Sequence, residues 1–212
     1  PLAIDPVIVD PEYIYLIPTI NTYYDLTKSS LTSAAVESNI RQAITEYSTK
    51  NLERFGNKFR YSRFVRSLDN TSGGYILNND ASIKMQKRIT PSTDFVQSIS
   101  LEFHNPVVKT SLTSSDFVYS GSVSKLEDDG NGVVNIVRTN SDNTKTVIVA
   151  NAGTINYDSG KIFLPDFAPS SYSNLEMSVS VEPQTLDVTP IRKQILLIQE
   201  QDARITVYGE QT

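Results

Sequence analysis

Cysteine is absent from all 212 residues of the chain, and histidine occurs once. Without cysteine there is no disulfide, no thiolate zinc site and no cysteine nucleophile, a composition that fits a protein made in a reducing cytosol. No run approaches the roughly 18 apolar residues that a membrane-spanning helix needs, and no basic segment precedes an apolar one as in a secretory signal. We therefore expect no membrane insertion.

Motifs that carry catalysis or hold a cofactor are also missing. His104, which would have to serve as a catalytic base, ends an alternating strand before Asn105 and Pro106, and no G-x-S-x-G sequence accompanies it. We interpret it as structural or solvent-facing. Gly73-Gly74 lacks the lysine of a phosphate-binding loop. The sequence thus predicts no enzyme, cofactor or metal site, although a pair of glycosidase carboxylates stays open because spatial distance defines it.

The acidic segment Glu127–Gly132, EDDGNG, has the composition of a calcium-binding loop. An EF-hand would require an acid or amide where Val133 stands and a glutamate where Asn140 stands. Asp, Gly and Asn also suit the backbone of tight turns. We predict a hairpin turn here.

The clearest positive signal is an amphipathic helix over residues 33–55. Apolar residues follow one helical face, and Thr32 precedes them as an N-cap, with Leu31 and Val36 placed as a hydrophobic staple. Gly56 stands where a left-handed residue often follows a helix. The face consists of Val36, Ile40, Ala43, Ile44 and Tyr47.

Strand patterns surround this helix. Residues 13–17 form an apolar run that Pro18 is expected to end, and residues 81–89 alternate after a predicted turn at Asn78–Asp80. The segment after Ser62 fits either a short helix, with Ser62 as its cap and Phe64, Val65 and Leu68 on one side, or a strand. Beyond residue 106 the pattern is of strands alone, including the hairpin GTINYDSGKIFLP at 153–165, a linker with Pro165 and Pro169, and strands near 177–181, 194–198 and 204–208.

These patterns predict an α+β fold in two parts. Residues 1–106 would form a small α+β domain with one long helix packed on a mixed or antiparallel sheet, and residues 107–212 a mostly antiparallel β domain. The length permits one large or two small domains with a buried core. Because the first residue is Pro1 and not Met, we expect a piece of a longer or processed chain.

Charge is distributed unevenly. Between Arg41 and Arg66 the balance is +5, whereas the whole chain carries −5, so the rest carries −10. Such a basic segment on an acidic protein indicates a complementary partner surface, or else a solvated helix end. Aromatic and cationic residues interleave at its end, a mixture that also suits nucleic acid, but the acidic pI of about 4.9 argues against that. The candidate protein interface comprises Phe59, Arg60, Tyr61, Arg63, Phe64 and Arg66.

Residues 20–69 resemble the C-terminal half of baseplate wedge proteins from T-even-like contractile-tailed bacteriophages, within the broader baseplate J-like group. The resemblance rests on the preceding strand, the N-T-Y-Y-D turn at 21–25, the helix ending in Leu52-Glu53-Arg54-Phe55-Gly56, and the Phe59-Arg60-Tyr61-Ser62 segment that leads to Leu68-Asp69-Asn70. Weaker agreement continues through Ile89-Thr90-Pro91 and the hairpin at 153–162.

This resemblance implies a structural subunit of the tail baseplate in the virion, assembled in the host cytoplasm. It would self-associate, as a homodimer, and dock neighbouring wedge proteins to build the ring around the central hub. No catalytic residue is implied. Two alternatives from other classes stay open: a receptor- or carbohydrate-binding β-module whose Tyr-rich strands stack sugars, and, third, a hydrolase that uses His104.

Overall fold

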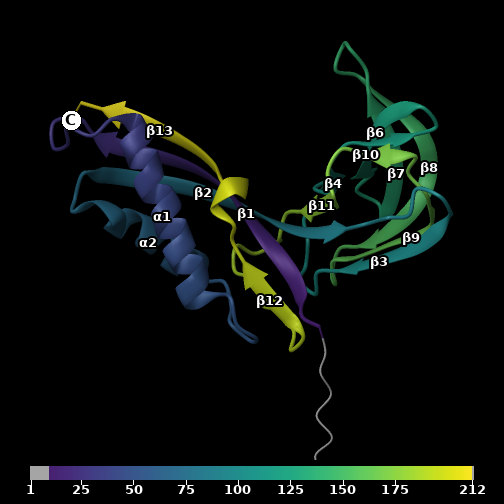
Figure 1. The fold of residues 1–212 in the computed structure, drawn as a ribbon, viewed down its shortest axis with the longest axis horizontal. Helices are drawn as coiled ribbons and strands as arrows, with labels where there is room; N and C mark the ends of the chain where they lie inside the picture. The colour runs from purple at the N-terminus through teal and green to yellow at the C-terminus, as the bar shows by residue number, and fades with distance from the viewer. Residues whose placement is uncertain (1–9, 212) are drawn as a thin grey trace, which may run out of the picture.

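The computed structural model describes residues 10–211, and Pro1 lies outside them. The chain forms two lobes (Figure 1). A helical lobe holds both α-helices and strands from the two ends of the described chain, and a β lobe holds the strands between. The elements in chain order are β1 (Glu12–Asp25), α1 (Ser33–Asn51), α2 (Tyr61–Asp69), η1 (Asn70–Ser72), β2 (Ile76–Ile89), β3 (Gln97–Glu102), β4 (Thr113–Ser114), β5 (Phe117–Tyr119), β6 (Ser122–Asp128), β7 (Val133–Thr139), β8 (Lys145–Asn156), β9 (Lys161–Phe167), β10 (Ser171–Tyr172), β11 (Met177–Val181), β12 (Gln194–Leu197), η2 (Glu200–Asp202) and β13 (Arg204–Glu210).

Strand β1 is the centre of the helical lobe. Its even-numbered residues from Ile14 to Tyr24 are buried on the face that both helices cover, and its odd-numbered residues from Tyr13 to Tyr23 lie on the opposite face. On one side β1 pairs antiparallel with β2, and on the other it pairs parallel first with β12 and then with β13. The mixed sheet predicted from the sequence is therefore present, and its two parallel neighbours come from the last part of the chain.

The prediction that Pro18 ends the first strand is wrong. β1 continues to Asp25, so the N-T-Y-Y-D segment is strand and the turn follows at 26–28. Pairing with β12 ends at Tyr15 and pairing with β13 begins at Thr19, which places Pro18 where the parallel neighbour changes. A residue without an N–H is tolerated there because that side carries no continuous ladder.

Helix α1 begins where the sequence predicts and ends earlier. The hydroxyl of Thr32 accepts a hydrogen bond from the Ala35 amide at 3.2 Å, which confirms the N-cap. The helix ends at Asn51 and not at residue 55. It has 19 residues, so the long helix of the predicted fold is not shown, although the α+β class is broadly consistent with the structure. Its last turn closes on Ser48, whose carbonyl accepts from the amides of Leu52 and Glu53 at 2.8 and 3.3 Å.

The segment after Phe59 is helical, which settles the choice between helix and strand. α2 begins at Tyr61 after Arg60, and not after the predicted cap Ser62. Phe64 and Leu68 are its buried residues, as the apolar spacing indicates. Both helices contribute to the core on the covered face of the sheet.

The predicted turn at Asn78–Asp80 is also wrong, because these residues lie inside the 14-residue strand β2. Asn79 is buried, and its side chain is satisfied on both sides: its oxygen accepts from the Thr22 hydroxyl at 2.6 Å and its nitrogen donates to Asp69 at 2.7 Å. A turn-favouring residue can occupy a strand when tertiary partners satisfy its amide. The alternation of Ala81, Ile83 and Met85 is confirmed as buried.

The β lobe is an antiparallel meander in which β6, β7, β8 and β9 pair in sequence order. The hairpin at 153–165 is confirmed, with Thr154 opposite Phe163 and Ile155 opposite Ile162. Pro165 belongs to β9 and not to a linker. The register between β3 and β9 shifts between Gln97 and Ile99, opposite Phe167 and Leu164, and this irregularity accommodates the proline.

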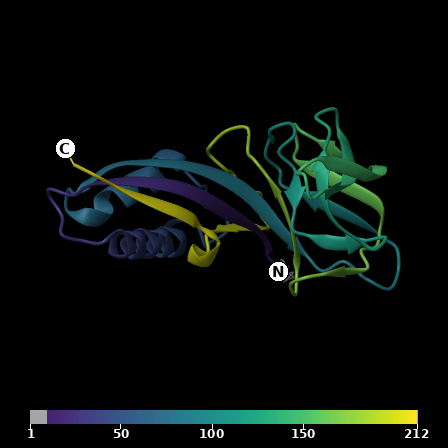
Figure 2. The ribbon, with the colours of Figure 1, turned by 90° about the horizontal axis from the view of Figure 1, so that it is seen from above.

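The two lobes share strands and core. β2 runs from the helical lobe towards the β lobe, where residues 85–89 pair with β11, and β3 pairs with β9. Figure 2 shows the long strands curving from one lobe to the other. One continuous cluster of buried apolar side chains includes Ile14 and Leu16 of β1 as well as Ile162 and Leu164 of β9. Several pairings therefore cross the predicted boundary at residue 106, and the two-domain division stays a prediction.

Candidate protein-interaction site

The aromatic residues of the predicted interface form part of the core. Phe59 and Phe64 are fully buried, with ring centroids 5.5 Å apart, and Tyr47 of α1 packs its ring edge against Phe64 at 5.2 Å. Phe59 also bridges to Val188 through backbone hydrogen bonds in both directions. These rings fasten the α1–α2 connection to the sheet and are not displayed on the surface.

Arg60 and Tyr61 are engaged within the chain. The Arg60 guanidinium lies 2.7 Å from an Asp187 carboxylate oxygen, and the other oxygen accepts the Tyr61 amide at 2.9 Å. The hydrogen bond from Arg60, followed by that from Tyr61, lowers the Asp187 pKa. The Tyr61 hydroxyl donates to the Ala81 carbonyl at 2.8 Å. Asp187 thus caps the N-terminus of α2 from a distant loop.

Arg63 and Arg66 are the two members of the predicted interface that remain exposed and without an ion pair among the described residues. They lie one helical turn apart on α2 and line a groove of about 320 Å³ between α2 and α1. Lys50 of α1 lines the same groove, and Ala43 and Tyr47 contribute its apolar part. The residues best placed for an external contact are therefore cationic and not aromatic.

The structure thus divides the six predicted interface residues into three pairs. Phe59 and Phe64 are buried, Arg60 and Tyr61 are bonded to neighbouring loops and strands, and Arg63 and Arg66 face the groove. Lys50 and Glu46, also in the groove, were not among the predicted residues. The helical period of α1 places both beside the apolar face, a signal that could have identified them. The interface itself stays a prediction.

A second surface is the uncovered face of the sheet formed by β13, β1 and β2. Tyr23 and Tyr208 stack there with ring centroids 5.0 Å apart, and Tyr13 is 45% exposed further along β1. β13 pairs with β1, and no other described strand pairs with its outer side. Nothing in the local sequence indicates that Tyr23 and Tyr208 meet, because parallel pairing between distant strands leaves no local signal.

A polar cavity of about 510 Å³ lies where the lobes meet, on the same uncovered side of the sheet. Hydroxyl and amide groups dominate its lining. Three cations also contribute, of which Lys84 is paired with Glu182 at 3.2 Å and Lys125 with Asp116 at 3.6 Å. Its polar members include Ser114, Ser178, Ser180, Gln86, Asn174 and Arg204.

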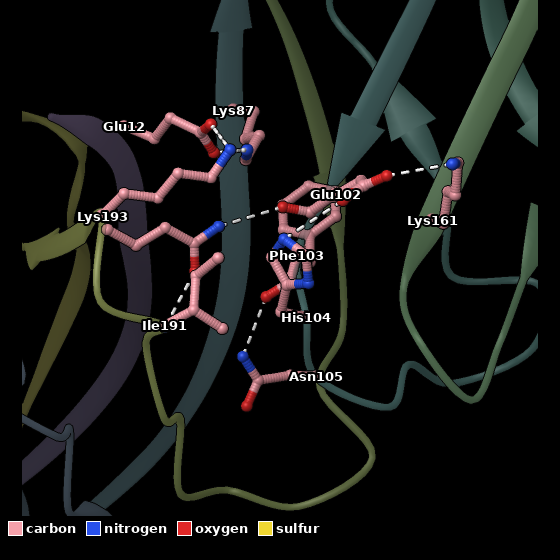
Figure 3. A network of polar contacts seen from close by, with 10 residues as sticks. Glu12, Lys87, Glu102, Phe103, His104, Asn105, Lys161, Ile191 and Lys193 are labelled. Atoms are coloured by element: carbon pink, nitrogen blue, oxygen red, sulfur yellow. Dashed lines mark hydrogen bonds and ion pairs between the residues drawn. The ribbon is translucent and has the colours of Figure 1, made fainter. Parts of the chain in front are cut away.

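A network of charged groups joins the lobes (Figure 3). Glu12 of β1 contacts Lys193 at 2.5 Å and Lys87 at 3.2 Å. Burial opposes the ionisation of Glu12, but the hydrogen bonds from these two lysines outweigh it and lower its pKa. On the other side of the junction, the Gln194 side chain donates to the Glu102 carbonyl at 3.2 Å, which ties β12 to β3.

His104 lies beside this network and not in a catalytic arrangement. Its Nε2 is 3.2 Å from a Glu102 carboxylate oxygen, without the geometry of a hydrogen bond, and its backbone adopts a φ of +53°. The carboxylate is held instead by Lys161 at 3.0 Å, a hydrogen bond that lowers the Glu102 pKa. Among the hydrogen bonds and ion pairs of residues 10–211, the approach to Glu102 is the one that involves this imidazole.

The predicted hairpin turn is present and joins β6 to β7, but it comprises residues 129–132, because Glu127 and Asp128 are the last residues of β6. Asp129 accepts hydrogen bonds from the amides of Asn131 and Val133 at 2.8 and 3.1 Å, so its carboxylate is used to hold the turn.

Within residues 10–211 no cluster of three or more His, Asp or Glu side chains is arranged to hold a metal ion. No helix in the same range is long and apolar enough to cross a membrane.

Part of the chain, within the helical lobe and β2, is similar to a known protein family. Residues 12–88 match the family model described as baseplate structural protein gp6, C-terminal domain III. The matched segment runs from the start of β1 to the end of β2 and so includes both helices and the groove between them. A search among curated proteins gave no match. The family match supports a phage baseplate protein with a structural role among other baseplate proteins.

Proposed function

We propose that this chain is a structural subunit of a phage tail baseplate wedge, which self-associates and docks neighbouring wedge proteins to build the ring around the central hub. The match of residues 12–88 to a baseplate structural family is the observation that carries this proposal. The location that follows is the tail baseplate of the virion. The role requires contact surfaces and no catalytic chemistry.

Two surfaces of the helical lobe support the proposal. The outer side of β13 offers backbone groups that a second chain could pair with. The groove between α1 and α2 offers the exposed cations Arg63 and Arg66. We assign self-association to the edge of β13 and heterologous docking to the groove, so each half of the proposal has its own test.

Self-association is tested by sedimentation equilibrium of the full chain and of Thr206→Lys. Thr206 is exposed in β13, and a charge on an edge strand opposes pairing with another chain. We expect the unmodified chain to dimerise with increasing concentration and Thr206→Lys to shift towards monomer. Ser38→Lys, which places the same charge on an exposed position of α1, should leave the dimer intact. A strict monomer at every concentration would count heavily against the proposal.

Docking is tested by reversing the groove charges with Arg63→Glu and Arg66→Glu together. Because neither side chain has an ion pair among residues 10–211, the variant should unfold at the same urea concentration as the parent. We expect it to lose co-purification with the neighbouring wedge subunits. If the variant folds and still assembles, the arginines are merely solvated and the docking half is wrong.

A second candidate function is a receptor- or carbohydrate-binding module. The polar cavity between the lobes favours it, since hydroxyl, amide and cationic groups converge there beside the uncovered sheet face. Binding on a glycan array that is lost in Arg204→Ala would support this function over a purely structural one. Absence of glycan binding together with dimerisation would support the wedge subunit.

A further inference from the structure

The groove between α1 and α2 is elongated. Next to the hollow lined by Arg63 and Arg66 lies a second one of about 510 Å³, which shares Ala43, Glu46, Ser67 and Asn70 with the first and continues to Asn39 and Thr71. The two hollows therefore form one channel along the helix pair. Such a shape suits a segment of polypeptide better than a compact small molecule.

The two ends of this channel differ in charge. Lys50, Arg63 and Arg66 gather at the end nearer Asn51, and none of them has an ion pair among the described residues. The single acid there, Glu46, accepts a hydrogen bond from Gln42 at 2.9 Å. The other end is lined by neutral amides and hydroxyls. The channel is thus net positive at one end, in a chain whose overall charge is −5.

Two other cations close to these helices form ion pairs within the chain, unlike Lys50, Arg63 and Arg66. Arg41 of α1 pairs with Glu37 at 2.7 Å, and Arg60 before α2 pairs with Asp187 at the same distance. The guanidinium groups of Arg63 and Arg66 are left available at a spacing of one helical turn, which suits two carboxylates on one ligand.

From this geometry we infer that the channel binds an acidic, extended segment of a neighbouring protein, whose carboxylates pair with Lys50, Arg63 and Arg66 while the Asn70 amide hydrogen-bonds its backbone. The amide nitrogens of Asn39 and Gln42 already donate to Tyr75 at 3.0 Å and to Glu46 at 2.9 Å. The inference rests on the proposed docking function and names the chemistry of the docked partner. Nucleic acid fits less well, because single strands stack on exposed aromatic rings and Tyr47 in this channel is only 5% exposed.

Titration of the ¹⁵N-labelled chain with a hexaglutamate peptide tests the inference, since NMR detects weak binding and locates it. We expect amide shifts confined to residues 39–51 and 63–71. The variant with Arg63→Glu and Arg66→Glu should bind roughly tenfold more weakly or not at all. A matched variant with Arg138→Glu and Arg192→Glu changes the net charge equally at exposed positions outside the channel, and should bind within about twofold of the parent.

Several outcomes would overturn the inference. These are an absence of shifts in the channel, an equal loss of binding in the matched variant, and tighter binding of a hexathymidylate than of hexaglutamate, which would indicate nucleic acid. Should the glutamate variant not fold, Arg63→Gln with Arg66→Gln removes the charges without reversal and serves the same comparison. The proposed function fails separately: a monomer that assembles with no wedge subunit but binds hexaglutamate in the channel would refute that function alone.

Discussion

Among single residues, Asp187 makes contacts that determine how α2 is held. Its two carboxylate oxygens serve different groups, the Arg60 guanidinium and the Tyr61 amide. Because the capping residue lies in a loop 126 residues further along the chain, the sequence around Tyr61 does not indicate it. The local candidate Ser62 was therefore preferred by sequence reasoning although it does not cap the helix.

Replacing Asp187 with alanine should destabilise the chain by about 1–2 kcal/mol, the usual cost of a lost helix cap, with only a small part from the exposed ion pair. Urea unfolding at pH 7 measures the difference. Asp158→Ala is the control, since that carboxylate is exposed and has no hydrogen bond or ion pair among the described residues. An equal effect in both variants would contradict the capping role.

The same substitution should act in a pH-dependent manner. The folded pKa of Asp187 lies below its ordinary value of 3.8, so its stabilisation is fully present above that pH and is lost as the pH falls through the folded pKa. The stability gap between the parent and Asp187→Ala should accordingly narrow in acid below pH 3.8. A gap that stays constant down to pH 2 would show that the carboxylate charge is not responsible.

Among the elements, α1 shows which features can be predicted from sequence. Its apolar period and the Thr32 cap are local, and both were identified correctly. Its end is not local, because the Ser48 hydroxyl accepts the Ile198 amide at 2.9 Å and donates to Glu53 at 2.8 Å. The candidate site divides in the same way: the sequence placed Arg63 and Arg66 together, but could not show that Phe59 and Phe64 turn inward onto Tyr47.

The contact between α1 and Ile198, the residue after β12, can be broken with Ser48→Ala. This substitution leaves the buried Ile198 amide without its acceptor, which should cost about 1–3 kcal/mol. Hydrogen exchange at Ile198 should accelerate more than at the amides of β12. Ser38→Ala, on the exposed side of α1, should change neither quantity, and unchanged exchange at Ile198 in Ser48→Ala would refute the link.

For the whole molecule, the main question is whether the two lobes can fold alone. β1 takes both parallel neighbours from beyond residue 190, and the end of β2 pairs with β11. The strand pattern of residues 107–212 was visible in the sequence, but these pairings were not, because Val179 and Lys87 meet only in three dimensions. We propose that the lobes depend on each other.

Expression of residues 1–106 alone tests this dependence. We expect the fragment to lack a cooperative urea transition, because both edges of its sheet lose the strands that pair with them in the full chain. Residues 1–212 should instead unfold in one transition. Circular dichroism and tyrosine fluorescence, which no tryptophan obscures in this chain, follow the unfolding of the fragment and of the full chain. A fragment that unfolds cooperatively would instead support the two independent domains predicted from the sequence.

The parallel pairing of β1 with β12 also sets an order on synthesis. Glu12 can pair with Gln194 only after about 180 further residues have been synthesised. At 5–20 residues per second, this synthesis takes roughly 10–40 s. During that time the β6–β9 meander, whose strands are neighbours in sequence, can already close. The outer strand β13 is thus made last, so a nascent chain cannot present its proposed self-association surface before residues 204–210 have been made.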